Sequence, residues 1–329
     1  MKKYDVYGIG NALVDKEFEV EDEFFANNNI EKGFMTLIEP DDQQALLDSL
    51  LNSYSLRKRA GGGSAANSIY ALSQFGGNAF FSCKVANDEP GDFYVSELGS
   101  LNIDTNLSAE REPGVTGRCL VMVTPDAERT MATSLGISQL VSSAELNKEA
   151  IANSQYVYTE GYLVTSPSAK AAVLEMKRCA KEAGSKFAMT FSDPAMVEYF
   201  KDGINEFIGD GVDLLFCNEQ EAKLWAEVDS LAEACEALKA KAKTFAITLG
   251  AKGALLFDGS DYIEVAPHQV KAVDTNGAGD MFSGALLYGL TQGKSFAEAG
   301  ALASLASAKI VSQFGPRLTP QQHSELLKA

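Results

Sequence analysis

Short apolar runs suited to β-strands alternate with helical segments along most of this 329-residue chain. Several runs are apolar at consecutive positions, which is typical of strands covered by helices on both faces. The runs are Asp5–Ile9, Ala79–Cys83, Tyr156–Thr159, Phe187–Phe191, Leu214–Cys217, Phe245–Leu249 and Ala254–Phe257. This alternation predicts an α/β fold, a three-layer α/β/α sandwich around a largely parallel central sheet.

Capping residues mark the ends of helices between these strands. Ser166 and Pro167 are an N-cap followed by proline at the first helical position, and Gly184 marks the end of that helix. Ser295, with Glu298 three residues later, forms a capping box that starts another helix. These signals support helical connections between the strands.

Two segments interrupt the alternation. Residues 13–38 and 111–134 contain stretches of period 2, such as residues 118–123, and we see no helical pattern between their short turns. Although they are far apart in sequence, they could pair as a small separate sheet that projects from the body. We therefore predict an α/β body of residues 1–12, 39–110 and 135–329, and a small β lid of residues 13–38 and 111–134.

Composition narrows the classes of partner. The net charge of −17 argues against nucleic acid or an anionic membrane surface as the main partner. No stretch approaches 18 apolar residues, so we expect no membrane span. The 5 cysteines are scattered without a C-x-x-C pair, which predicts reduced thiols in a cytoplasmic protein, and 2 histidines make a His/Cys zinc site improbable.

The segment D-T-N-G-A-G-D-M-F, residues 274–282, removes bulky side chains just before an apolar helix. The first N–H groups of a helix lack partners and its N-terminus is positive, so Gly277, Ala278 and Gly279 predict an oxyanion or phosphate cradle. Asp280 beside it can orient and deprotonate a hydroxyl, which suggests phosphoryl transfer. The alternative is a glycine turn in which Asp280 only stabilises the helix N-terminus.

Other phosphate-binding motifs are missing. The sequence holds no Walker A loop, G-x-x-x-x-G-K-[ST]. The stretch G-I-G-N-A-L, residues 8–13, begins like a dinucleotide fingerprint, but Leu13 stands where the third glycine is required. A dehydrogenase is therefore a weak alternative.

Residues 274–282 resemble the C-terminal signature of the ribokinase-like, or PfkB, family of carbohydrate and nucleoside kinases. Further segments are similar to family motifs and occur in the family's order: Gly61–Asn67, Gly76–Gly77, Asn87–Asp92, the N-x-x-E motif of Asn218–Glu221 and the T-L-G-x-x-G motif of Thr248–Gly253. The resemblance covers nearly the whole chain. It implies an α/β/α body with a small β lid, and ATP-dependent phosphorylation of a hydroxymethyl group.

The resemblance also implies roles for individual residues. Asp280 would be the catalytic base, with the N–H groups of residues 277–279 holding the developing charge. Asn218 and Glu221 would organise Mg²⁺ through its waters, unless they only cap the helix that follows residue 217. The residues expected to border the nucleotide are Asn218, Thr248, Gly250, Gly253, Gly277 and Gly279. A monovalent cation such as K⁺ would lie near Asp274 and residues 312–315.

Substrate recognition is expected near the N-terminus. Asp15 could accept two hydrogen bonds from a vicinal diol, Gly62 and Gly63 would let backbone approach a sugar, and Asn67 could bind another hydroxyl. The pattern G-N-x-L-x-D around Asn11 is similar to the opening of adenosine kinases in the family. Arg129 could neutralise phosphate charge.

We therefore expect a nucleoside substrate, adenosine first, converted to AMP. Phe34, Leu37 and Leu135 are candidate walls for its base. The alternative is a free sugar or sugar acid of the ribose, fructose or 2-keto-3-deoxygluconate type, for which Arg118 could supply a cation. The lid either closes over substrate alone or also joins two copies as a homodimer.

Overall fold

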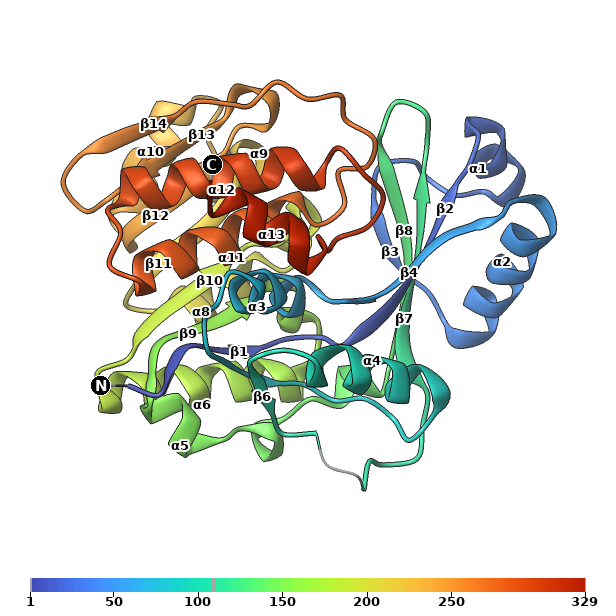
Figure 1. Ribbon diagram of the computed structural model, residues 1–329, viewed down its shortest axis with the longest axis horizontal. Coiled ribbons are helices and arrows are strands. Elements are labelled where there is room, and N and C mark those ends of the chain that lie inside the picture. Colours follow the sequence, from blue (N-terminus) through green and yellow to red (C-terminus); the bar gives the residue numbers. More distant parts are fainter. Residues whose placement is uncertain (1, 108–109, 329) are drawn as a thin grey trace.

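The computed structural model describes residues 2–107 and 110–328 and contains two sheets (Figure 1). The larger has 9 strands in the order β14-β13-β12-β11-β10-β9-β1-β5-β6, and the smaller has 5 in the order β3-β8-β7-β2-β4. The large sheet forms the body, and the small sheet stands beside it as the lid. The predicted fold class, an α/β body with a largely parallel sheet and a small second sheet, is confirmed.

The body sheet contains every strand expected from the apolar runs. Its strands are β1 (Tyr4–Ile9), β5 (Ala79–Ser82), β6 (Ile103–Thr105), β9 (Ser154–Glu160), β10 (Lys186–Thr190), β11 (Val212–Asn218), β12 (Ala242–Thr248), β13 (Ala254–Phe257) and β14 (Tyr262–Val265). Neighbouring strands are parallel except at the edge, where β13 pairs antiparallel with both β12 and β14.

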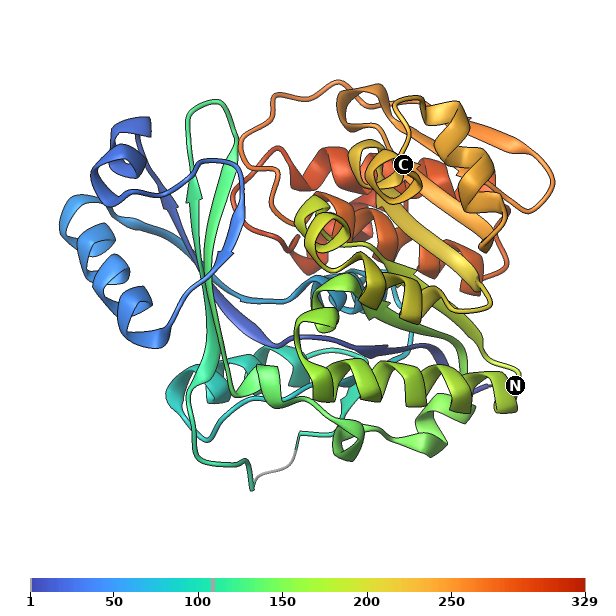
Figure 2. The same ribbon diagram turned by 180° about the vertical axis from the view of Figure 1, so that it is seen from behind.

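Helices cover both faces of this sheet (Figures 1 and 2). Side chains alternate along each strand, so Val6 joins the core on one face and Tyr7 the core on the other. One face carries α3 (Ser64–Gln74), α4 (Glu89–Gly99), α11 (Ala278–Thr291), α12 (Phe296–Ile310) and α13 (Pro320–Leu326). The other carries α5 (Lys148–Ala152), α6 (Pro167–Ala183), α7 (Pro194–Tyr199), α8 (Lys201–Ile208), α9 (Glu219–Ala226) and α10 (Leu231–Lys239).

The expected helix ends are present. The Ser166 side chain accepts from the N–H of Ala169 at the start of α6, and Gly184 ends the helix in the left-handed conformation. Ser295 and Glu298 form both bonds of a capping box at α12. Within residues 2–107 and 110–328, no helix is long and apolar enough to cross a bilayer. The cysteines are all free thiols.

The lid is larger than the predicted segments. Its strands are β2 (Leu13–Glu19), β3 (Met35–Leu37), β4 (Leu56–Gly62), β7 (Thr116–Val123) and β8 (Arg129–Gly136). Helices α1 (Asp22–Asn28) and α2 (Pro40–Ser53) cover its outer face, where Leu47 and Leu50 pack with Phe18, Leu120 and Met122.

The sequence-based lid boundaries therefore need two corrections. Residues 40–62 and residues 135–136 belong with the lid and not with the body, because α2 finds its apolar partners on the small sheet, β4 pairs with β2, and β8 pairs with β7 as far as Gly136. The segment 13–38 also contains α1, whose 7 residues are too few to give a clear helical period.

Four connections join body and lid; one runs from β6 to β7, and the other three are short. The chain leaves β1 at Ile9 and enters β2 at Leu13, and it returns from β4 to α3 across Gly63 alone. It leaves β8 at Gly136 and enters the 3₁₀ turn Ile137–Leu140 directly. Gly63 and Gly136 have φ values of +102° and +51°, a region that favours glycine.

Candidate active site

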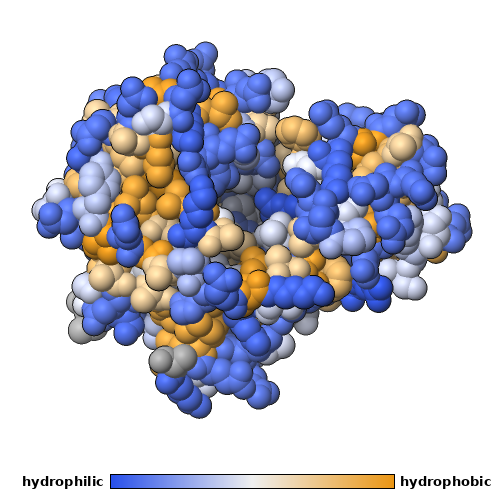
Figure 3. All heavy atoms as spheres, turned by 90° about the horizontal axis from the view of Figure 1, so that it is seen from above, coloured by the Kyte–Doolittle hydropathy of each residue, from blue (hydrophilic) through white to orange (hydrophobic). Residues whose placement is uncertain are grey.

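A cavity of about 260 Å³ lies where the lid meets the body. Figure 3 shows the hollow between the two parts. The body contributes residues at or just beyond the carboxyl ends of its parallel strands, together with the N-termini of α3 and α11. The lid contributes the inner face of its sheet. This is the edge at which open α/β sheets bind ligands.

The N-terminus of α11 is built to receive an anion. Gly277 is its N-cap at φ +74°, and a Cβ there would lie 2.7 Å from Pro316 Cα, so the site needs glycine. A Cβ on Gly279 would meet no heavy atom of the described chain within 4 Å, so the space above the helix end is open. Residues 277–279, the predicted phosphate cradle, line the cavity, so a phosphoryl group could reach the N–H groups at this helix end.

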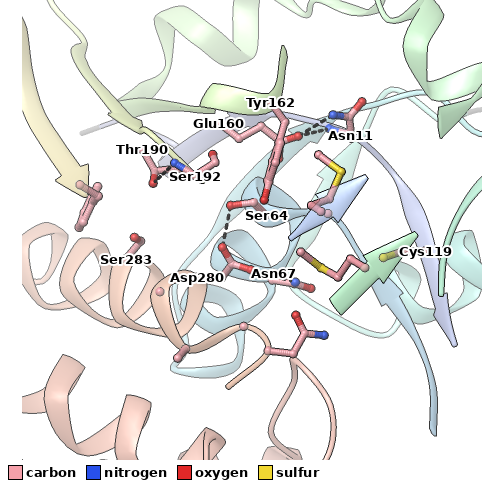
Figure 4. A pocket seen from close by; sticks show the side chains of 18 of the residues that line it. Asn11, Ser64, Asn67, Cys119, Glu160, Tyr162, Thr190, Ser192, Asp280 and Ser283 are labelled. Carbon is pink, nitrogen blue, oxygen red and sulfur yellow. Dashed lines mark hydrogen bonds between the residues drawn. The ribbon is translucent and has the colours of Figure 1, made fainter. Parts of the chain in front are cut away.

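Asp280 lies beside this cradle with both carboxylate oxygens anchored (Figure 4). Ser64 Oγ donates to Oδ1 at 2.6 Å, and Asn67 Nδ2 donates to Oδ2 at 3.0 Å. Burial raises the pKa of Asp280, while the bonds from Ser64 and Asn67 oppose that rise. A carboxylate with a raised pKa is a better proton acceptor than an ordinary aspartate.

Asp15 lies on β2 and faces the cavity from the lid. It is 5% exposed, and burial raises its pKa to about 7 against the opposing charge of Arg317. A Cβ on Gly62 would lie 2.1 Å from Asp15 Oδ1, so Gly62 makes room for this carboxylate without lining the cavity itself. Gly63 and Asn67 do line it, and their contact with substrate stays a prediction.

Glu160, at the end of β9, was not singled out from the sequence. Its Oε1 accepts from the backbone N and Nδ2 of Asn11, both at 2.9 Å, and its Oε2 accepts from Ala65 N at 2.7 Å (Figure 4). Burial raises its pKa to about 7. The carboxylate thus fixes Asn11, a predicted substrate residue, against the start of α3. An acidic residue directly after the apolar run 156–159 was the available signal.

Asn218 and Glu221 line the cavity and also cap α9. Asn218 Oδ1 accepts from Glu221 N at 2.8 Å, and the Glu221 carboxylate accepts from Asn218 N and Nδ2, both at 2.9 Å. Burial raises the pKa of Glu221 to about 7. The helix-capping alternative is therefore realised alongside the placement in the cavity.

The donor set is compatible with Mg²⁺ held largely by water and phosphate. Among the residues that the structure describes, no cluster of three or more acidic, histidine or cysteine side chains could hold a metal ion alone. Mg²⁺ keeps several waters and is often bound through one carboxylate plus substrate phosphates. Glu221 at the cavity wall can take part in such a set through water.

The residues of the predicted nucleotide motif Thr248–Gly253 do not all lie at the cavity. Thr248 lines the cavity, but Gly250 and Gly253 do not. They shape the turn between β12 and β13 with φ values of +59° and +95°, and a Cβ on Gly253 would lie 2.0 Å from the carbonyl oxygen of Val265. Their part in this structure is the turn that ends β12.

The two candidate arginines of the lid point to opposite sides. Arg129 lines the cavity and its Nη1 donates to Asn276 Oδ1 at 3.3 Å. The prediction for Arg118 is wrong, because along β7 the neighbouring Cys119 faces the cavity and Arg118 reaches Gln44 Oε1 on α2 at 3.2 Å. Arg129 is the single basic side chain in the described lining, whereas the acidic ones are Asp15, Glu160, Glu221 and Asp280.

Asp274 is buried and joins two loops. Its Oδ1 accepts from Asn276 N at 2.8 Å and its Oδ2 from Gly315 N at 3.0 Å. Both oxygens therefore have backbone partners, and binding of a monovalent cation here stays a prediction.

Apolar side chains complete the cavity. They include Leu13, Met35, Leu37, Met131 and Leu135 from the lid and Phe216 and Phe282 from the body. Leu37 and Leu135 were expected, whereas Phe34 is 51% exposed and outside the lining. The lid thus forms an apolar slot next to Asp15.

Comparisons with known proteins agree with this fold. The family model described as pfkB family carbohydrate kinase matches residues 35–323. The crystal structure of adenosine kinase from Sinorhizobium meliloti has a TM-score of 0.93 at 33% identity, with 99% of this chain and 100% of that chain covered. A probable sugar kinase from Rhizobium etli CFN 42 has a TM-score of 0.93 at 31% identity, with 100% and 99% covered.

A curated relative extends the comparison. Adenosine kinase of Saccharomyces cerevisiae is 26% identical over 330 residues, which cover 94% of this chain and 95% of the relative. With the anion cradle, the adjacent aspartate and the lid in place, the chain belongs to the PfkB family of carbohydrate kinases and is a phosphotransferase.

Proposed function

We propose that this kinase transfers the γ-phosphoryl group of ATP to the hydroxymethyl group of a nucleoside, adenosine first, to give AMP. The observation that carries the substrate class is the apolar slot of the lid beside Asp15. A carboxylate suits the vicinal diol of ribose, and the slot suits a base that a free sugar lacks. The likeness to adenosine kinases from bacteria and yeast supports the same substrate.

The reaction follows from the side chains around Asp280. The substrate hydroxyl donates to the Asp280 carboxylate, which takes its proton as the oxygen–phosphorus bond forms and the bond to the departing ADP breaks. The N–H groups of residues 277–279 and the Arg129 guanidinium stabilise the negative charge on the moving phosphoryl group. Mg²⁺, bound with the nucleotide, would supply charge neutralisation. Asn218 and Glu221 would orient its waters.

A free-sugar kinase is the second candidate, supported by the likeness to the probable sugar kinase from Rhizobium etli. Ribose offers Asp15 the same diol. A sugar acid is disfavoured, because Arg118 faces α2 and the described lining holds four acidic side chains against Arg129 alone. A substrate carboxylate would therefore meet a net negative pocket.

The test is ADP release with ATP and Mg²⁺ against adenosine, inosine, guanosine, ribose, fructose and 2-keto-3-deoxygluconate. We expect turnover with adenosine that falls roughly 10³-fold in Asp280→Asn, with adenosine binding retained by calorimetry. Asp261→Asn makes the same chemical change at an exposed position between β13 and β14 and should leave turnover unchanged. Turnover with a sugar but not with adenosine would show that the substrate is a sugar and not a nucleoside. Unaltered turnover in Asp280→Asn would refute the role of Asp280 as the catalytic base.

A further inference from the structure

A buried arginine lies behind the cavity without lining it. Arg317, between α12 and α13, is 5% exposed. Its guanidinium carbon lies 4.4 Å from the ring centre of Tyr70, and its Nη1 donates to Glu97 Oε2 at 2.8 Å. Glu97 Oε2 also accepts from Gly61 N at 2.5 Å. The guanidinium is therefore fixed by a ring and a carboxylate.

The third contact of Arg317 leads to the reacting site. Its Nε donates to Asn67 Oδ1 at 3.1 Å, and Asn67 Nδ2 donates to Asp280 Oδ2 at 3.0 Å. A carboxamide has one accepting end and one donating end. If the Asn67 amide turned over, its oxygen would face the Asp280 carboxylate and its NH₂ would face the guanidinium. The bond from Arg317 and the bond to Asp280 therefore favour the same orientation of the Asn67 amide.

We propose that Arg317 is a positioning residue for phosphoryl transfer, which acts through Asn67 to hold the Asp280 carboxylate in the orientation that receives the substrate's proton. The inference rests on the proposed role of Asp280. Ser64 anchors Oδ1 and Asn67 anchors Oδ2, so the carboxylate plane cannot rotate while both bonds persist. Each oxygen keeps a lone pair for the substrate hydroxyl.

The chemistry of arginine suits this task. A planar guanidinium donates in several fixed directions, whereas a lysine ammonium is a single point of charge. Arg317 uses Nε for Asn67 and Nη1 for Glu97, while its buried Nη2 has no hydrogen-bond partner among the described residues. Burial raises the pKa of Asp280, and the positive charge of Arg317 is among the contributions that oppose this rise and so favour the carboxylate form.

The experiment is a double-mutant cycle with adenosine kinase turnover as the readout. We expect Arg317→Met to lower kcat about 10- to 100-fold, with the KM for ATP changed less than about 3-fold, because orientation and not nucleotide binding is lost. In an Asn67→Ala background the same change should cost less than about 2-fold, since the intermediary is already gone. Arg317→Lys keeps the charge beside Glu97 but loses the Nε donor, so it should fold and still show the kcat loss.

A remote, partly buried cation provides the control for destabilisation. Lys177 Nζ donates to the carbonyls of Phe207, Ile208 and Gly211 at the end of α8, outside the cavity. Lys177→Met should lower the melting temperature and leave kcat unchanged.

Two results would overturn the inference: a folded Arg317→Lys with wild-type kcat, or losses from Arg317→Met and Asn67→Ala that multiply in the double variant. If the wild-type enzyme showed no adenosine turnover, the proposed function would fail, and if Asp280→Asn retained turnover, the proposed role of Asp280 would fail; both outcomes are distinct from these two results.

Discussion

Glu17 on β2 is a buried carboxyl group whose ionised form would destabilise the folded protein. It is 1% exposed, its Oε1 accepts from Asn276 Nδ2 at 3.2 Å, and its buried Oε2 has no partner in the described part of the chain. Burial, reinforced by the charges of Asp274 and Asp15, raises its pKa to about 8. Glu17→Gln keeps an acceptor for Asn276 and removes the ionisation.

The sign of the effect follows from where the proton is held. The ordinary pKa of glutamate is 4.5, so between that value and about 8 the unfolded chain releases the proton while the folded chain keeps it. The folded protein therefore loses stability as the pH rises through this window. We integrate this shift over pH to obtain the expected effect. The free energy of unfolding of Glu17→Gln, measured relative to that of wild type, should increase by roughly 2 kcal/mol between pH 5 and pH 7.

Urea denaturation at pH 5, 6, 7 and 8, followed by the fluorescence of Trp225, measures this difference. Glu31→Gln removes an exposed glutamate of the same lid and is the matched control. The difference in free energy of unfolding between this variant and wild type should change little across the same pH range. A difference between Glu17→Gln and wild type that stays constant or shrinks as the pH rises would refute the reasoning.

Two further predictions concern the cavity. Gly277→Ala should lower kcat on the order of 10²-fold, because the new Cβ meets Pro316 and displaces the cradle N–H groups; Gly293→Ala, also at positive φ but with open space and outside the cavity, should cost stability alone. Arg118→Ala should keep kcat and KM within about 2-fold, whereas Arg129→Ala should lower kcat more than about 10-fold, as steady-state assays would show. Equal effects of the two arginine variants would contradict the assignment of strand faces.

The body could be predicted from sequence because its signals are local. Apolar runs such as 245–249 become central strands, and the caps at Ser166 and Ser295 mark helix starts within a few residues. The lid boundary could not be predicted in the same way. The apolar face of α2 resembles that of any body helix, and only its packing on Phe18 and Leu120 assigns it to the small sheet.

The site, too, could be predicted only where its signals are local in sequence. Residues 277–280 lie within one short motif, so their shared location followed from the sequence. Glu160 and Arg317 act on Asn11 and Asn67, which are 149 and 250 positions away along the chain, and no local pattern reveals such pairs. Arg118 was misplaced because strand periodicity separates two faces without telling which one is inward.

The short connections between body and lid have a mechanical consequence. Any swing of the lid must turn at residues 10–12, at Gly63, at Gly136 and between β6 and β7, and Asn11 and Gly63 among these also line the cavity. Two of the joints of the lid are thus also part of the proposed acceptor-binding site. Opening of the lid would therefore shift residues of the acceptor site as well as expose that site to solvent. Water that entered the open molecule would then meet the phosphoryl donor without an ordered acceptor site from which to attack it. A lid transplanted from a relative would work only if these joints came with it.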